Sequence, residues 1–204
     1  MSWLKNLYNW VLGWSDSKWG SAALFILSFT EASFFPIPPD ILLIALCLGS
    51  RSNSFKFVFI CSLGSAMGAV FGYGIGNLLW WNGEGEFSSI ATFFISAIPG
   101  FSSELFYDIK LKYEEWNFWI VFVSGFTPIP FKVFTVSAGA FDINFNMFLI
   151  ASLVSRTSRF LLLGALIWKF GEPIRYFIDR YFNILAILFS VLLIGSFFAI
   201  KYLF

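Results

Sequence analysis

The sequence predicts an all-α polytopic integral membrane protein built from two inverted repeats, on three observations. Of its 204 residues, 58% are hydrophobic and only 12% are charged, whereas a soluble domain carries about 25% charged residues. Long apolar stretches fill most of the chain. One proline motif also occurs twice, each time between apolar stretches.

The repeated motif is Pro-Ile-Pro, then any residue, then a charge. It begins at Pro36 and again at Pro128, an offset of 92 positions, and ends on Asp40 in the first copy and Lys132 in the second. Proline lacks a backbone donor and clashes with the preceding turn, so each copy breaks a helix. Such a break is tolerated at membrane depth where it is buried in protein or lines a polar cavity. Ordinary loops between spans are the alternative. The expected hairpin tips are Pro36, Pro38, Pro39, Pro128 and Pro130.

Residues 1–204 are interpreted as one membrane domain. Tryptophans recur at helical spacing in residues 1–18, which predicts a helix lying in the membrane interface. Residues 19–81 form the first repeat. The apolar arms of 19–49 are each shorter than the about 20 residues of a span, which indicates a re-entrant hairpin, with a single kinked span as the alternative; residues 57–81 are a full span. Its glycines recur every fourth residue and predict a helix-packing face: Gly64, Gly68, Gly72 and Gly76.

Residues 82–116 are expected to hold an acidic outer loop and an amphipathic surface helix over 102–116, with an Asp108–Lys112 pair. Whether 91–101 enters the membrane stays open. Residues 117–168 repeat the hairpin-plus-span unit, and 169–204 give a surface helix and a C-terminal span.

The topology follows from the positions of Lys and Arg. The 51–56 loop and the segment 169–181 are rich in basic residues, whereas 82–90 carries acids and no base. The positive-inside rule places the first two, and the N-terminus, in the cytoplasm. The two hairpins then enter from opposite sides, and inverted repeats of this kind place a binding site near the midplane.

Five charges lie inside apolar sequence and are the candidate site. Lys132, Arg156 and Arg159 are the expected anion-binding bases, because arginine suits phosphate and carboxylate groups. Glu31 and Asp40 are the expected proton-coupling acids, because burial raises the pKa of a carboxyl. Asp40 would also serve as a helix cap, and the two arginines would also serve as plain ion-pair partners of the acids. Two acids against three bases leave one positive charge without a partner.

The composition excludes several classes of site. The chain has no histidine, which removes Ser-His hydrolases and His-ligated zinc sites. Cys47 and Cys61 lie in apolar sequence without Cys-x-x-Cys spacing. We therefore expect no catalytic residue, no metal and no cofactor, and the net charge of +1 argues against a nucleic-acid partner.

Three separated motifs resemble the DedA family, the bacterial relatives of SNARE-associated Golgi (VTT-domain) proteins. They run from Glu31 through Pro36 to Asp40, from Phe126 to Lys132 with Ala138-Gly139 following, and from Arg156 to Phe160. The likeness covers roughly residues 20–165. The Pro-Ile-Pro tips and the closely spaced acids match its YqaA-like branch. The resemblance implies two facing re-entrant hairpins, Glu31 and Asp40 as the acidic pair, Lys132 and Arg159 at basic positions, and proton-coupled movement of anionic lipid.

The predicted function is therefore a transporter or scramblase for anionic lipid, either phospholipid or polyprenyl phosphate, and not an enzyme. A non-transporting membrane assembly factor, with the glycine face as its partner surface, is the alternative, and an intramembrane lipid-headgroup enzyme is a weaker one. Membrane lipids are the expected partners, and a homo-oligomer is left open. The resemblance implies a bacterial cytoplasmic (inner) membrane.

Overall fold

The structure is a computed structural model that describes residues 19–35, 37–82, 85–97, 102–127, 129–171 and 173. Within these ranges the regular elements are helices, with one isolated bridge between Trp81 and Phe87. The expected helix over 1–18, nearly all of 169–204, and the tip residues Pro36 and Pro128 lie outside the described residues.

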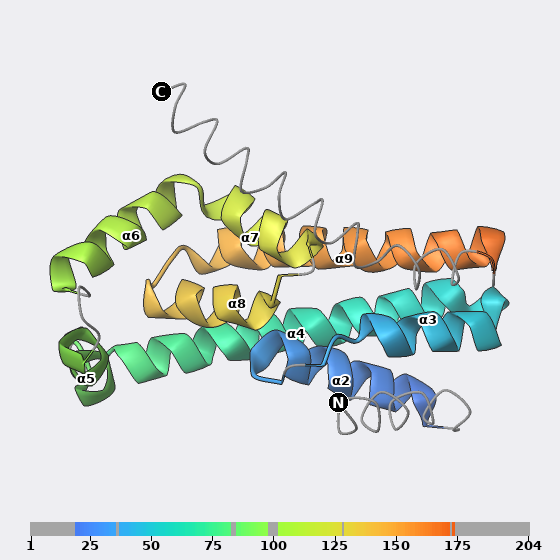
Figure 1. Ribbon diagram of the computed structural model, residues 1–204, viewed down its shortest axis with the longest axis horizontal. Coiled ribbons are helices and arrows are strands. Elements are labelled where there is room, and N and C mark those ends of the chain that lie inside the picture. The colour runs from blue at the N-terminus through green and yellow to red at the C-terminus, as the bar shows by residue number, and fades with distance from the viewer. Residues whose placement is uncertain are drawn as a thin grey trace.

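Two long helices, α4 (Ser54–Trp80) and α9 (Phe145–Phe170), lie antiparallel along the length of the molecule (Figure 1). A short 3-10 turn, η2 (Arg51–Asn53), leads into α4. The segments Arg51–Trp80 and Phe145–Phe170, of 30 and 26 residues, are long and apolar enough to cross a membrane. At 1.5 Å per residue each extends about 40 Å, more than the about 30 Å of a hydrocarbon core.

Each long helix is preceded in the chain by a pair of short helices. The first pair is α2 (Gly20–Ser33) and α3 (Asp40–Gly49), and the second is α7 (Asn117–Phe126) and α8 (Phe131–Ala140). The prolines act as expected at both breaks, because Pro39 occupies the N-cap of α3 and Pro130 the N-cap of α8. A ten-residue arm is about 15 Å long, half the thickness of a hydrocarbon core.

The two pairs approach the long helices from opposite ends. In Figure 1 the pair α2–α3 lies at one end of the molecule, the pair α7–α8 lies toward the other, and the breaks between their arms lie near the middle. The first arm of each pair packs on its own long helix, α2 on α4 and α7 on α9. The second arm packs on the other long helix, α3 on α9 and α8 on α4. The halves of the chain are thereby interlocked.

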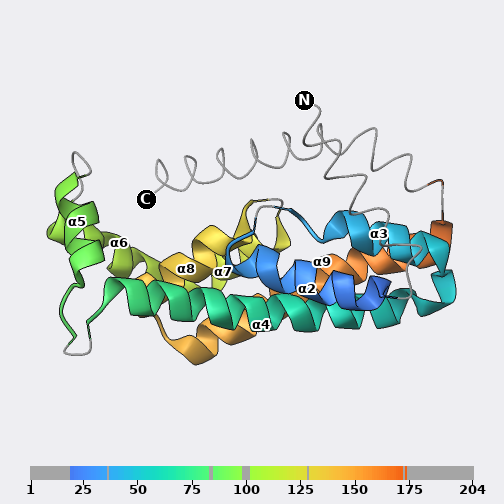
Figure 2. The same ribbon diagram turned by 90° about the horizontal axis from the view of Figure 1, so that it is seen from below.

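Two further helices follow α4: α5 (Ser89–Ala97) lies beyond its end and stands off the bundle in Figure 2, and α6 (Ser103–Glu115) runs back from there toward α7. The amphipathic helix predicted over 102–116 is α6, which begins at the Ser102 cap. The predicted Asp108–Lys112 pair is wrong: Lys110 pairs with Glu114 at 3.9 Å instead and lies over the Trp81 ring. An exposed ion pair contributes little free energy. The packing of Lys110 on the Trp81 ring therefore explains why this lysine, and not Lys112, forms the ion pair.

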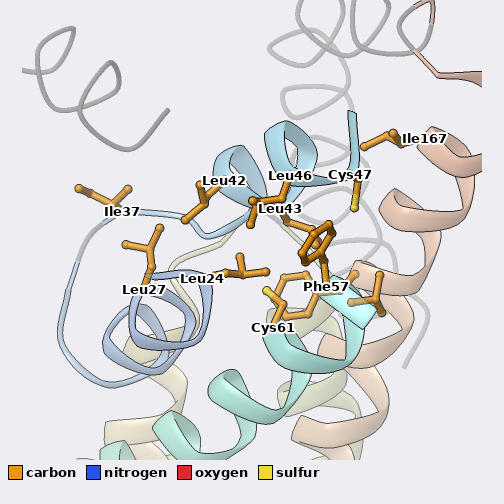
Figure 3. Close-up of a cluster of buried hydrophobic side chains, with 12 residues drawn as sticks. Leu24, Leu27, Ile37, Leu42, Leu43, Leu46, Cys47, Phe57, Cys61 and Ile167 are labelled. Atoms are coloured by element: carbon orange, nitrogen blue, oxygen red, sulfur yellow. The ribbon is translucent and has the colours of Figure 1, made fainter. Parts of the chain in front are cut away.

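The buried apolar side chains form two separate clusters. In the first, shown in Figure 3, side chains of α2, α3, α4 and α9 converge, among them Leu24, Leu43, Phe57 and Ile167. The second joins Phe131 of α8 with residues of α4, α7 and α9, such as Ala69, Val121 and Phe148. On α9 and α4 the polar residues fall between the two clusters in sequence, so a polar layer crosses the bundle between two apolar cores.

Candidate functional site

The polar layer is centred on two ion pairs between the first hairpin and α9. Arg156 donates from Nη2 to Oε2 of Glu31, and both side chains are buried. Arg159 donates from Nε to Oδ1 of Asp40 over 3.0 Å. Because each acid comes from one arm of the hairpin, the two pairs fasten both arms to the same helix.

Arg156 has its donors engaged on several sides. Its Nε donates to the hydroxyl of Ser65 on α4 over 2.8 Å. Its guanidinium carbon lies 5.1 Å from the ring centroid of Phe131 and 4.7 Å from that of Phe160. A cation between two aromatic faces is stabilised by their quadrupoles. Arg156 therefore joins α2, α4, α8 and α9 at one point.

Arg159 joins the tips of both hairpins. Asp40 is the first residue of α3, directly after the first break. The second partner of Arg159 is the backbone carbonyl of Phe126, the last residue of α7, which accepts from Nη1 over 3.0 Å. One guanidinium near the middle of α9 thus holds the two broken helices together. Pro39 is the N-cap residue of α3, and Asp40 places its acidic side chain in the first turn of that helix.

Lys132 is the charge in this layer without an ion pair among the described residues. It lies in the first turn of α8 and is partly exposed. It follows Phe131, whose ring lies against the guanidinium of Arg156. The two acids pair with the two arginines, so among the described residues Lys132 is the positive charge that remains without an ion pair.

Three buried hydroxyls near the ion pairs make no hydrogen bond within the described ranges: Ser62 on α4, Thr127 after α7, and Ser152 on α9. Buried polar groups are hydrogen-bonded in more than about nine cases in ten. These three hydroxyls therefore remain able to hydrogen-bond a ligand. Thr127 is 3% exposed and follows Phe126 at the second tip.

The glycine face of α4 lies at its contacts with α2 and α8. A Cβ added at Gly64 would come within 2.6 Å of the carbonyl oxygen of Phe25, and one at Gly68 would overlap that of Phe29. Gly72 faces Thr135, and a Cβ at Gly76 would overlap the carbonyl oxygen of Val136. The face is therefore occupied within this chain, which removes the partner surface suggested for an assembly factor.

Sequence reasoning missed several partners in and near the site. Ser65 and the carbonyl of Phe126 were not expected to bind the arginines, although Ser65 stands one residue from Gly64 on the packed side of α4. Arg51 was expected only as a basic residue of the cytoplasmic 51–56 loop, yet it donates to the carbonyl oxygen of Trp168 over 2.7 Å and so caps the end of α9. Among the described residues no group of three His, Cys, Asp or Glu side chains is arranged to hold a metal ion.

Comparison with known proteins gives three relatives. An uncharacterized protein of Haemophilus influenzae is 32% identical over 197 residues, 96% of each chain. An uncharacterized protein of Histophilus somni is 35% identical over 178 residues, covering 85% of this chain and 87% of its own. One of the archaeon Methanocaldococcus jannaschii is 26% identical over 149 residues, 69% of this chain and 79% of its own. No family model and no solved structure matches the chain.

Proposed function

We propose a function that would apply to a whole family. This chain belongs to the same family as the uncharacterized Haemophilus influenzae and Histophilus somni proteins. The proposal is that the protein is an integral membrane transporter or scramblase that moves anionic lipid across the bilayer. The observation that carries it is the polar layer at the meeting point of two broken helices, where Arg159 binds both tips and Lys132 adds a positive charge without an ion-pair partner.

The surface supports a membrane location. Large apolar side chains of both long helices are at least 40% exposed, including Phe59, Leu63 and Phe71 on α4 and Ile150 and Leu162 on α9. In water such a surface would drive association, whereas in a bilayer it faces acyl chains. The distribution of Lys and Arg favours a cytoplasmic N-terminus and 51–56 loop, and an outward-facing 82–90 loop, in a bacterial inner membrane.

The arrangement of the short arms supports an inverted-repeat transporter. Arms of about 15–21 Å enter from opposite ends and stop near the middle of the long helices (Figure 1). Broken helices of this kind place their termini at the substrate site. The first turn of α8, with Lys132, has the positive end of its helix dipole at the break. Arg159 and Lys132 are the proposed headgroup contacts, and Arg156 holds the layer together.

The acids are the proposed route to proton coupling. Glu31 neutralises Arg156. A proton taken up by Glu31 would add one positive charge to the layer and strengthen anion binding. The resemblance to the DedA family agrees with this assignment of acids and bases.

Lipid flux in liposomes tests the proposal. Purified protein is reconstituted with tail-labelled anionic lipid, and the label reaching the outer leaflet is quenched. We expect Lys132→Gln and Arg159→Gln to reduce flux at least about tenfold, because each removes one charged contact, while Lys132→Arg keeps it. Lys56→Gln, which removes an exposed lysine at the start of α4, is the matched control. Undiminished flux in both Lys132→Gln and Arg159→Gln would contradict the proposal.

A further inference from the structure

The polar layer contains five charged residues, which come from four helices. Glu31 lies on α2, Asp40 on α3, Lys132 on α8, and Arg156 and Arg159 on α9. Neither α4 beyond Lys56 nor α7 contributes a charged residue; at this level α4 supplies Ser65 and the buried thiol of Cys61. The layer formed by these described residues thus bears one net positive charge.

The two arginines differ in what they have left to offer a ligand. Arg156 is 4% exposed, bound to Glu31 and Ser65, and covered by two rings. Arg159 uses Nε for Asp40 and Nη1 for the Phe126 carbonyl, which leaves Nη2 without a hydrogen bond to a described residue, and its side chain is 13% exposed. Arg156 also keeps Nη1 without a hydrogen bond to a described residue, but its side chain is only 5% exposed, so Arg159 is the more accessible of the two arginines for a ligand.

Three unused polar groups belong to the second tip or to its arginine contact. Lys132 has no ion pair within the described ranges, Thr127 has a buried hydroxyl without a partner, and Nη2 of Arg159 completes the set. Donors of this kind suit a phosphate oxygen. The positive charge available to that phosphate is one, because Asp40 neutralises Arg159 and Glu31 neutralises Arg156.

The net charge of the layer selects among phosphates. Burying an uncompensated charge at membrane depth is costly, so a bound ligand is favoured when it brings the buried total to zero. A phosphodiester headgroup has one negative charge and does so. A phosphomonoester has close to two negative charges above its second pKa of about 6, and it would leave one negative charge buried.

On this basis, and resting on the proposed function, we propose that the site accepts phosphodiester lipids with one negative charge and discriminates against phosphomonoester lipids with two. Among the anionic lipids considered above, this favours phospholipids with a diester headgroup over lipid monophosphates such as polyprenyl phosphate. The discrimination is set by charge and not by headgroup size.

The test compares two lipids that differ by one methyl group. Tail-labelled phosphatidylmethanol, a phosphodiester, and phosphatidic acid, a phosphomonoester, are placed in separate phosphatidylcholine vesicles containing the same protein. Flux is measured at about pH 5, where both lipids have close to one charge, and at about pH 9, where phosphatidic acid has close to two. The quantity that decides is the ratio of the phosphatidic acid flux to the phosphatidylmethanol flux at each pH.

We expect a ratio near one at about pH 5 and a fall of at least about tenfold at about pH 9, since one extra buried charge is strongly disfavoured. Taking the ratio removes any effect of pH on the protein that both lipids share. A ratio unchanged between the two pH values, with both lipids moving, overturns the inference and leaves the proposed function standing. No movement of either lipid at either pH overturns both.

A variant provides a second, independent test of the inference. Glu31→Gln removes one negative charge from the layer, so it should raise the ratio at about pH 9 toward one. If Glu31→Gln folds and its ratio at about pH 9 stays as low as that of the parent, charge matching is not the cause of the discrimination. If it does not fold, the comparison of the two lipids on the unaltered protein decides alone.

Discussion

The two hairpins share one proline motif but are held in different ways. The first hairpin is fastened to α9 by charge, through Glu31 on Arg156 and Asp40 on Arg159, in addition to the close backbone contact of α2 with α4 at Gly64 and Gly68. The second has no ion pair among the described residues and relies on close backbone approach to α4: an added Cβ at Gly76 or Gly139 would overlap a carbonyl oxygen across the contact. The hydroxyl of Tyr73 also donates to the carbonyl of Ile143, just after α8, over 2.7 Å, and the indole nitrogen of Trp81 donates to the carbonyl of Ala140, the last residue of α8, over 2.9 Å.

This difference shows that residues at equivalent positions of the repeated motif can have different roles. Asp40 and Lys132 stand at the same place in the motif, each in the first turn of the helix after the break. Asp40 is buried and paired, whereas Lys132 is partly exposed and has no ion pair with a described residue. The first copy therefore provides attachment, and the second provides the charge that we assign to ligand binding.

The largest effect is expected where backbone contacts hold a hairpin. Gly76→Leu would force α8 away from α4, and Gly68→Leu would do the same to α2, because the new side chains meet backbone atoms that cannot turn aside. Overpacking costs about 1–3 kcal/mol in a yielding core and more here, so we expect loss of folded protein. Size-exclusion profile and thermal unfolding in detergent measure it.

Gly74→Leu is the matched control, since a Cβ at Gly74 meets nothing within 4 Å. Parent-like unfolding temperatures for Gly68→Leu and Gly76→Leu would show that close backbone contact does not hold these helices.

The next effect tests attachment by charge. Arg156→Met leaves Glu31 buried without its partner, and breaking a buried pair from one side costs about 3–5 kcal/mol. The double variant Arg156→Met with Glu31→Gln removes both charges and should recover at least half of that loss. Thermal unfolding of the two variants and of Glu31→Gln alone gives the interaction free energy between Arg156 and Glu31. A double variant no more stable than Arg156→Met would place the damage in packing against Phe131 and Phe160 rather than in charge.

A smaller effect separates the two equivalent positions of the motif. Asp40→Asn removes the partner of Arg159, and loss of such a charged hydrogen bond costs about 1.5–3 kcal/mol. Lys132→Gln breaks no ion pair, so its free energy of unfolding should stay within about 0.5 kcal/mol of the parent. Chemical or thermal unfolding of the two variants side by side measures the difference. Equal losses of stability would mean that both charges serve attachment.

The smallest effect concerns the link between the ends of the two long helices. Arg51→Met removes the hydrogen bond to the Trp168 carbonyl and should cost about 1 kcal/mol. Lys56→Met, on an exposed lysine nearby in the chain, is the control and should stay within about 0.5 kcal/mol. Thermal unfolding of the two variants is the measurement, and equal stabilities would make the capping contact energetically negligible.

Much of the helical arrangement was predictable because it depends on local chemistry. Two prolines end a helix wherever they occur, so the breaks at Pro38 and Pro130 followed from the motif alone. The span expected over 57–81 is α4, with boundaries within three residues, and the span expected to close the 117–168 unit is α9, which ends at Phe170. Glycine at every fourth position fixes a face, and that face is buried in the structure.

The pairing inside the site was harder, because it depends on which helices become neighbours. The sequence left open whether the arginines only pair with the acids, and the structure shows both acids paired with them. The carbonyl of Phe126 could not be found from residue type, since every residue carries a carbonyl and only the broken end of α7 leaves this one free. Arg51 was missed for the same reason at the end of α9.

The ion pairs between the first hairpin and α9 also set an order of assembly. Glu31 and Arg156 are 125 positions apart, and Asp40 and Arg159 are 119 apart. At about 5–20 residues per second, a ribosome needs roughly 6–25 s to pass from an acid to its base. During that interval the first hairpin has no arginine from α9, and in the membrane location proposed above its acids would disfavour entry into hydrocarbon. The N-terminal half should therefore wait in the insertion machinery or at the membrane surface until α9 emerges, so a chain truncated before Arg156 is expected to be degraded rather than to accumulate as half a bundle.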